Sequence, residues 1–177
     1  MKLPLRYYGH ADLRTKAKPI DTITPEIRQL AADMIETMIE HNGVGLAAPQ
    51  VGQLVRMFIR RFEGVNAEGE YYLGPPEVIL NPVLTQPSKE TTTQVEGCLS
   101  VPGVLVHVER PRKIHLRYQN LEGAWIEEEI EDFKARVTMH ENDHLNGTLH
   151  IDRAEAAERR NIEPLLSSIK KKHNFTS

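Results

Sequence analysis

Apolar residues recur every three or four positions between residues 27 and 39, which predicts one amphipathic helix near the amino terminus. The positions are Ile27, Leu30, Ala31, Met34, Ile35, Met38 and Ile39. Thr24 is placed to cap this helix, and Pro25 suits its first turn because the missing N–H has no partner there. We expect Gly43 to end the helix, with Met34 and Met38 filling the core.

From about residue 56 to residue 131 the pattern changes to short apolar runs separated by turn residues, which predicts strands. The expected strands span residues 55–59, 78–82, 104–108, 113–118 and 124–130. The mixed polar stretch 63–76 is predicted to be a surface loop. Residues 120–123 (Asn-Leu-Glu-Gly) predict a hairpin connection between the last two strands.

Two helices are predicted after these strands. Asp132 can cap the first of them, and Gly147 can end it. In the second, Pro164 interrupts an apolar pattern at helical spacing, and a proline inside a helix costs about 3 kcal/mol. If Asn161 is the N-cap, Pro164 falls in the first turn, so we expect a break near Asn161 and a helix to about Lys172.

The length of 177 residues is that of one ordinary domain, so we expect a single catalytic domain over 1–177, with residues 163–177 as a carboxy-terminal helix and basic tail. The net charge of −3 gives no sign of a nucleic-acid-binding body. The amino terminus lacks an apolar signal stretch, and no run approaches membrane-spanning length. One free cysteine fits a reducing cytoplasm. Lys170–Lys172 is interpreted as a solvated helix end, with a docking patch as the alternative.

The strongest chemical signal is His140-Glu141-Asn142-Asp143-His144, an H-E-x-x-H pattern within the first of these two helices. Residues four apart lie on one helical face, so His140 and His144 can reach the same metal ion. Glu141 can accept a proton from water at that metal. The alternative is a partly buried histidine pair beside a solvated acid.

A third metal ligand can come from two places. His150 completes H-E-x-x-H-x-x-G-x-x-H, the extended metzincin pattern, but no methionine follows His150 to supply the Met-turn of that class. Cys98 is the only cysteine, and a thiolate binds zinc or ferrous iron well. Its alternative role is that of a small buried apolar residue. These residues alone leave both ligands open.

A third segment, residues 43–52, is small, apolar and glycine-rich, with Gln50 as its single polar side chain. Such a segment lets a substrate backbone approach closely, and a lone amide is a plausible donor to an oxyanion. By itself the segment is equally typical of a turn between a helix and a strand.

Together the three segments resemble peptide deformylases. The signatures of that family are G-x-G-x-A-A-x-Q, E-G-C-x-S and H-E-x-x-H, and they are complete here at residues 43–50, 96–100 and 140–144. The resemblance runs from about residue 16 to Arg153. It implies an α+β fold in which antiparallel β-sheets wrap around a central metal-binding helix, with one amino-terminal and one carboxy-terminal helix.

The resemblance also implies hydrolysis of the formyl group from N-formylmethionyl nascent peptides, with release of formate. It implies one divalent metal ion per chain, ferrous iron in the cell, with zinc, nickel or cobalt in preparations. The implied metal ligands are Cys98, His140 and His144. Glu141 would be the general base, and the Gln50 amide and Leu99 N–H would meet the oxyanion.

Substrate would pair with the backbone of Val44, Gly45 and Gly97 as an added strand. A methionine pocket would be lined by Val44, Phe133, Val137 and His140. Glu96 and Arg110 are predicted to pair and brace the turn that aims Cys98. The basic patch Lys170–Lys172 is a candidate contact with the ribosome, where nascent peptides emerge.

Three positions depart from the family pattern: Met139 precedes the first metal histidine, His150 replaces an aromatic or aliphatic residue, and Gly9-His10-Ala11 replaces a proline-centred turn. None of them removes a ligand or the base. Two other functions stay open on the residues alone, a metzincin-like zinc endopeptidase using His150 and a non-catalytic, metal-stabilised binding module. An intact Glu141 and Gln50 argue against the second.

Overall fold

A computed structural model describes residues 1–173, and the end of the predicted basic tail, residues 174–177, lies outside the described residues. The helices are α1 (Pro25–Glu40), α2 (Asp132–Leu145), α3 (Ala156–Asn161) and α4 (Glu163–His173), with short 3-10 helices at Ala11–Arg14, Ala48–Val51 and His150–Arg153. The strands are β1 (Gly45–Ala47), β2 (Met57–Arg60), β3 (Glu63–Val65), β4 (Tyr71–Leu73), β5 (Glu77–Thr85), β6 (Thr91–Cys98), β7 (Val101–Pro111), β8 (Lys113–Gln119) and β9 (Trp125–Glu131).

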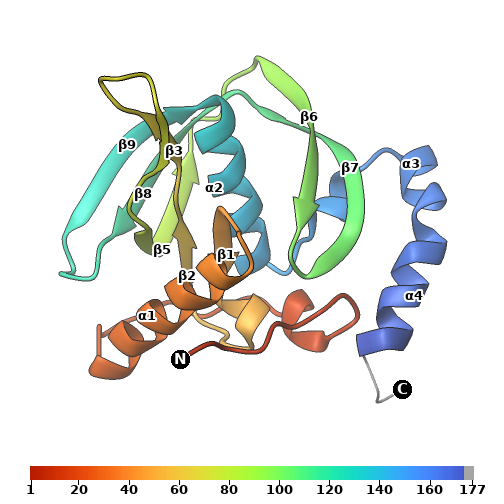
Figure 1. The fold of residues 1–177 in the computed structure, drawn as a ribbon, viewed down its shortest axis with the longest axis horizontal. Coiled ribbons are helices and arrows are strands. Elements are labelled where there is room, and N and C mark those ends of the chain that lie inside the picture. Colours follow the sequence, from red (N-terminus) through yellow and green to blue (C-terminus); the bar gives the residue numbers. More distant parts are fainter. Residues whose placement is uncertain (174–177) are drawn as a thin grey trace.

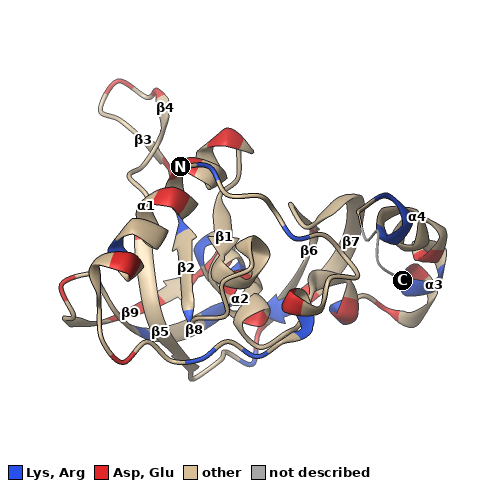
Figure 2. Ribbon diagram, turned by 90° about the horizontal axis from the view of Figure 1, so that it is seen from below, with Lys and Arg blue, Asp and Glu red and all other residues tan. Residues whose placement is uncertain are grey.

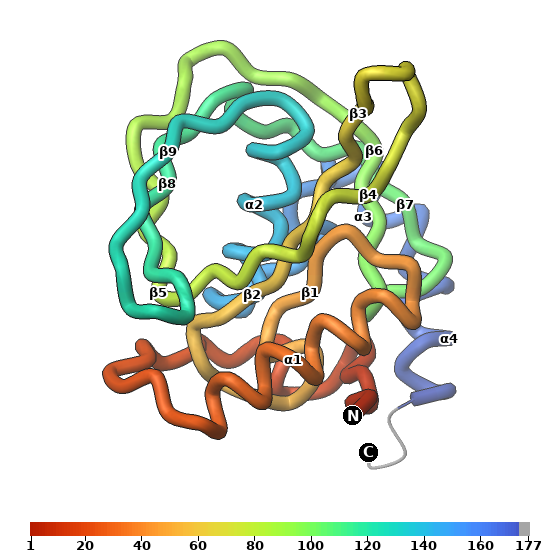
Figure 3. The backbone as a smooth tube through the Cα atoms, turned by 60° about the vertical axis from the view of Figure 1, so that its left-hand side comes forward, coloured from red at the N-terminus to blue at the C-terminus, as the bar shows by residue number. Residues whose placement is uncertain are grey.

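All named strand pairs are antiparallel. They form one five-stranded sheet in the order β1-β2-β5-β8-β9 and two hairpins, β3-β4 and β6-β7. Figures 1 and 3 show α2 between the five-stranded sheet on one side and the β6-β7 hairpin on the other. The predicted α+β architecture around a central helix is therefore confirmed.

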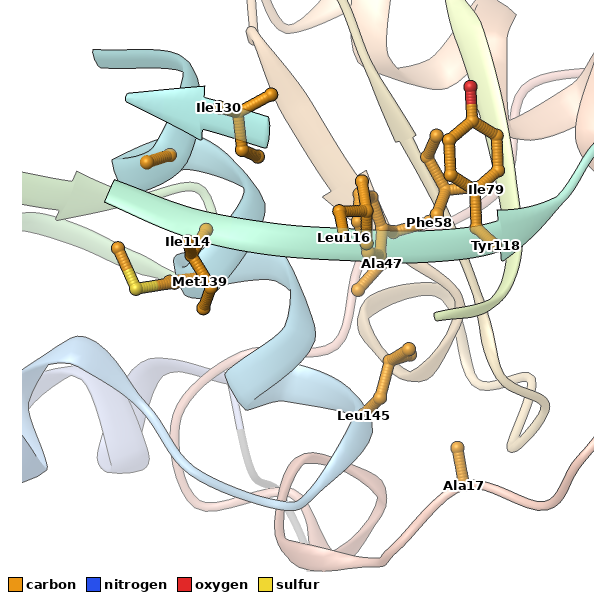
Figure 4. Packing of buried hydrophobic residues seen from close by; sticks show 11 residues of the cluster. Ala17, Ala47, Phe58, Ile79, Ile114, Leu116, Tyr118, Ile130, Met139 and Leu145 are labelled. Carbon is orange, nitrogen blue, oxygen red and sulfur yellow. The ribbon is translucent and has the colours of Figure 1, made fainter. Parts of the chain in front are cut away.

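One apolar cluster holds α2 against the five-stranded sheet. Met139 and Leu145 of α2 pack with Phe58 of β2 and with Leu116 and Tyr118 of β8 (Figure 4). Burial of large apolar side chains is the main force that fixes one element on another. Among residues 1–173, no helix is long and apolar enough to cross a membrane.

The amino-terminal helix begins as predicted, with the Thr24 hydroxyl accepting a hydrogen bond from Ile27 N–H at 3.2 Å. Met34 and Met38 are fully buried, as expected. The prediction that Gly43 ends α1 is wrong, because the helix stops at Glu40. Asn42 takes the left-handed conformation with φ 55°, a role that asparagine can fill in place of glycine.

The strands of residues 78–82, 104–108 and 113–118 are confirmed within β5, β7 and β8, and those at 55–59 and 124–130 appear, with shifted bounds, as β2 and β9. The surface loop predicted at 63–76 is wrong, because it contains the β3-β4 hairpin, whose turn is closed by the Asn66 side chain accepting from Glu68 and Glu70 N–H. Strands β1 and β6 were not predicted. In β6 only Glu96 is buried, so the strand lacks an alternating apolar pattern.

Asp132 does not cap α2. It is the first helical residue, its own φ is 57°, and its carboxylate lies 3.4 Å from the Arg112 guanidinium instead. Its N–H bonds to the Arg112 carbonyl, which ties this junction to the sheet. The predicted end at Gly147 is confirmed, because Gly147 has φ 74° and its N–H reaches the His144 carbonyl at 3.2 Å.

The break near Asn161 is confirmed, but Asn161 does not act as an N-cap. It ends α3, a short helix that was not predicted, and Ile162 separates the two helices. Pro164 is the second residue of α4, so it lies in the first turn, as expected. Helix α4 then runs to His173, one residue past the predicted end.

Candidate metal centre

Helix α2 carries the predicted ligands His140 and His144 and the predicted base Glu141 into the interior. The rings of His140 and His144 lie on one face, with centroids 5.2 Å apart. The side chains of Glu141 and His144 are 3% and 1% exposed. Polar groups buried to this degree need partners inside the protein, because leaving them unpaired costs free energy.

Cys98 reaches the same place from another element. It is the last residue of β6, before the two-residue turn into β7, and the pairing register of β6 and β7 shifts between Glu96 and Cys98. The shift leaves Gly97 out of the ladder. The Sγ atom of Cys98 lies 3.3 Å from His144 Nε2.

The ligand atoms of Cys98, His140 and His144 all lie within 4.8 Å of one another. A tetrahedral zinc site with ordinary Zn–S and Zn–N bonds separates sulfur and nitrogen ligands by about 3.6 Å. The three side chains therefore fit a single divalent metal. A thiolate with two imidazoles suits zinc, ferrous iron, cobalt or nickel, and leaves a fourth position open.

His150, the alternative third ligand, lies outside this cluster. Its side chain is buried, and its Nε2–H donates to the Val104 carbonyl at 3.1 Å. The ring centroid is 5.7 Å from that of His140. Since Nε2 is already bonded and Nδ1 is not among the clustered ligand atoms, the geometry favours Cys98 over His150 as the third ligand.

The predicted contact between Glu96 and Arg110 is present and belongs to a larger buried network. Arg110 donates to both Glu96 oxygens at 2.6 and 2.9 Å, and to Asp143 at 3.0 Å. Arg136 donates to Glu96 at 2.7 Å, and His140 Nδ1–H donates to Glu96 at 2.9 Å. The last bond turns His140 Nε2 toward the cluster, as is common for metal-binding histidines.

Sequence reasoning missed Arg136 and Asp143. A signal was available for Arg136, because it precedes His140 by one helical turn and therefore shares its face. Asp143 gave no comparable signal. Its partners Arg110 and Arg153 come from β7 and from the 3-10 helix after α2, so only the packing of those elements defines it.

The site separates the pKa values of its two glutamates. Burial by itself raises the pKa of Glu96, but the hydrogen bonds from Arg110 and His140 outweigh it and hold that pKa far below the usual range. Glu141 has no such donors, and burial raises its pKa to about 7. Burial, together with the nearby charge of His140, lowers the pKa of His144 well below its usual value.

A pocket of about 680 Å³ opens onto this cluster, within the usual size range of small-ligand sites. It brings together most of the residues predicted for catalysis and substrate binding: Val44, Gly45, Gln50, Glu96, Gly97, Cys98, Leu99, Phe133, Val137, His140 and Glu141. His144 and Arg110 are not part of this lining. Met139 and His150, two departures from the family pattern, are also outside the lining.

Gln50 is held rigidly beside the thiol. Its side-chain oxygen accepts a hydrogen bond from Ala47 N–H at 2.9 Å, so the amide nitrogen Nε2 points away from Ala47. Nε2 donates to the Ser100 hydroxyl at 3.1 Å and lies 3.6 Å from Cys98 Sγ. An amide fixed in this way is pre-oriented as a donor toward the cluster.

Gly45 has a role that the sequence did not indicate. A Cβ atom at this position would lie 2.9 Å from both Cγ and Cδ of Glu141, closer than real Cβ contacts allow. At Gly97 the nearest atom to an added Cβ is the tip of the exposed Leu105 side chain, also at 2.9 Å, which can move. The lack of a side chain at Gly45 thus gives Glu141 its space.

We expect Arg110→Ala to lower metal affinity about 10–100-fold, because Arg110 orients Glu96, and Glu96 orients His140. It should also lower the free energy of unfolding by about 3–5 kcal/mol, since the buried acids Glu96 and Asp143 each lose one of their charged partners. Glu96→Gln removes the same charge with less change of shape and should weaken metal binding in the same direction. Metal titration and chemical denaturation measure both effects.

The matched control is Arg112→Ala, two residues further along the chain, between β7 and β8. Arg112 pairs at the surface with Glu90 and Asp132, and ion pairs of this exposed kind contribute little to stability because water and salt screen them. Metal affinity should not change in this variant. Unchanged affinity in both Arg110→Ala and Glu96→Gln would show that the network does not support the metal site.

Comparison with known proteins is consistent with this geometry. The family model described as polypeptide deformylase matches residues 2–160. The peptide deformylase of Thermotoga neapolitana is 40% identical over 167 residues, covering 94% of this chain and 96% of its own. Among solved structures, the peptide deformylase of Thermotoga maritima has a TM-score of 0.78 at 40% identity, covering 88% of this chain and 99% of its own. A class I type b peptide deformylase of Acinetobacter baumannii, solved with Met-Ala-Ser bound, has a TM-score of 0.79 at 36% identity, covering 86% and 98%.

Proposed function

Because this chain belongs to the polypeptide deformylase family and is a metal-dependent deformylase, we propose that it removes the formyl group from N-formylmethionyl nascent peptides and releases formate. The observation that carries the proposal is the cluster of Cys98, His140 and His144 beside the buried carboxylate of Glu141. A binding module would need no unpartnered carboxylate there, and Glu141 Oε2 is buried without a hydrogen-bond partner among the described residues.

Cys98, His140 and His144 would hold the metal, which when bound supplies Lewis-acid activation of water and of the formyl carbonyl. Glu141 takes the proton from the attacking water and returns it to the departing amine. Its Oε2 has no hydrogen-bond donor among the described residues, which leaves that oxygen available for this transfer.

Two donors would meet the negative charge that develops on the formyl oxygen. The Gln50 amide is fixed by Ala47 and Ser100, so it need not reorganise during the reaction. The second donor is the Leu99 N–H, in the turn directly after Cys98. Both belong to the pocket lining.

The substrate would lie extended in the pocket, with its backbone beside Val44, Gly45 and Gly97. Its methionine side chain would enter the apolar part of the pocket, formed by Val44, Phe133 and Val137. The Acinetobacter baumannii relative holds a tripeptide that begins with methionine, which supports a peptide of this chemistry as the ligand.

The metal in the cell is proposed to be ferrous iron, and a thiolate ligand fits a reducing cytoplasm. Zinc, nickel or cobalt would replace it in preparations. For the basic residues 170–172 we propose a contact with the ribosome, where nascent chains emerge. The support for this last point is their charge alone.

The proposed function is tested by purifying the protein without oxygen, measuring its metal, and assaying a formyl-Met peptide beside an acetyl-Met peptide and an internal peptide bond. We expect formate from the first substrate and no product from the other two. Cleavage of the internal bond would instead favour the endopeptidase alternative, and metal binding without any turnover would favour a binding module.

Gly45→Ala should lower turnover while the protein keeps its metal, because the added Cβ displaces Glu141 and leaves the three ligands in place. The decisive comparison is a double-mutant cycle with Glu141→Ala. If Gly45 acts through Glu141, the double variant should be no slower than Glu141→Ala alone. Additive losses would mean that Gly45 acts on the substrate by a separate route.

A further inference from the structure

The carboxy-terminal helix forms part of the wall of the active-site pocket. Lys172 and His173, the last two described residues of α4, line the same cavity as Glu141 and His140. Tyr7, from the opposite end of the chain, lines it beside them. Figure 1 shows the end of α4 beside the amino-terminal segment.

The end of α4 is held in place by contacts on two faces. Leu166 and Ile169 are buried in the apolar cluster around β7, and His173 continues the same face one turn further. The His173 ring stacks on the Tyr7 ring, with centroids 3.8 Å apart and an interplanar angle of 18°. One turn earlier, the Lys170 ammonium lies 5.6 Å from the centre of the Tyr8 ring.

The amino-terminal segment joins this wall to the catalytic turn. Tyr8 N–H donates to the Ser100 carbonyl at 2.9 Å, and the Ser100 hydroxyl in turn accepts from Gln50. Lys172 therefore has a defined position relative to the reacting centre and does not belong to a free tail.

The charge of this wall has no acidic counterpart in the pocket. Of the lining residues, the acids are Glu96 and Glu141, which are buried at the metal end. Lys172 is exposed, and within residues 1–173 it forms no ion pair. Figure 2 shows the basic stretches of α4 at the side of the molecule away from the five-stranded sheet.

Resting on the function proposed above, we propose that Lys172 is a specificity-determining residue that favours formylated peptides carrying a carboxylate downstream of the methionine. When the methionine lies at the metal end, the following residues pass the exposed wall where Lys172 stands. Because the ammonium is exposed, the preference should be about two- to fivefold in kcat/KM. It should decline as salt is added, since salt screens exposed charges.

The carboxylate can be an acidic side chain or the free carboxyl end of a short peptide, and C-terminal amidation separates the two. The test compares amidated formyl-Met peptides in which one Glu or one Gln occupies the second, third or fourth position of an alanine background. A parallel pair without Glu, one amidated and one with a free carboxyl end, measures the terminal carboxylate. Each peptide is assayed at low and high salt.

Three forms of the full-length protein are compared: the wild type, Lys172→Glu and Lys171→Glu. The variant Lys171→Glu makes the same change of charge one residue earlier on α4, but Lys171 does not line the pocket. The measured quantity is the ratio of kcat/KM for the acidic and neutral peptides within one protein, so partial loss of folded enzyme cancels.

In the wild type we expect the carboxylate-bearing peptide to be favoured at one or more positions at low salt, and the ratio to fall toward one at high salt. Lys172→Glu should abolish or reverse the preference, whereas Lys171→Glu should retain it. A ratio of one in the wild type, or equal ratios in both variants, would overturn the proposal. If no formyl peptide is turned over at all, the proposed function fails instead.

Discussion

Cys98→Ala is expected to abolish metal binding and turnover together. The side chain supplies the only sulfur in the cluster, 3.3 Å from His144 Nε2, and alanine offers no ligand atom. The metal would then have two protein ligands, His140 and His144, in place of three. Metal content by elemental analysis and deformylation of a formyl-Met peptide would both be measured.

The control for this experiment is His150→Gln, since glutamine retains an N–H that can donate to the Val104 carbonyl. His150 lies outside the ligand cluster, so this variant should keep its metal and most of its activity. Metal loss in His150→Gln with retention in Cys98→Ala would reverse the assignment of the third ligand. Such a result would also return the metzincin-like arrangement to consideration.

Glu141→Ala is expected to lower turnover by about 10²–10⁴-fold, the usual contribution of a general base, while the metal stays bound. The reason is that Glu141 adjoins the cluster of Cys98, His140 and His144 without belonging to it. Glu141→Gln keeps the shape of the side chain beside Gly45 but cannot accept the proton, so its loss should be of similar size.

His140→Ala provides the comparison for Glu141→Ala, because His140 is a proposed ligand on the same helix. Metal content should separate the two variants, with loss in His140→Ala and retention in both Glu141 variants. If Glu141→Ala loses metal as readily as His140→Ala does, Glu141 supports the metal and the role of base belongs elsewhere.

The sequence predicted those features that depend on neighbours along the chain. The spacing of His140 and His144 requires only a helix to place both rings on one face, and the apolar spacing of residues 27–39 was enough to identify α1 and its buried methionines. It was less reliable where local signals compete. Asn42 rather than Gly43 took the left-handed position after α1, and Asp132 bonded to Arg112 instead of capping α2.

Polar strands were the main omission in the predicted fold. Strand β6 exposes threonines and buries a glutamate, so its sequence lacks the alternation of an ordinary strand. The reason lies in its partners, since Glu96 is buried only because Arg110, Arg136 and His140 surround it. Because residues far away in the sequence bury this charge, the local pattern of apolar and polar residues cannot predict its burial.

The sequence alone predicted the ligand types and the base and was enough to identify the family, because helical spacing and three short motifs are local properties of the chain. The family motifs already favoured Cys98 over His150 as the third ligand, but only the tertiary structure shows how Cys98 comes to lie beside the two histidines. Cys98 is 46 positions from His144, and the β6-β7 hairpin must pack on α2 to bring them together. The space that Gly45 leaves for Glu141 and the place of Lys172 in the pocket wall have the same origin. Each depends on elements far apart in the chain, whose contacts are set by burial of apolar surface and not by local sequence.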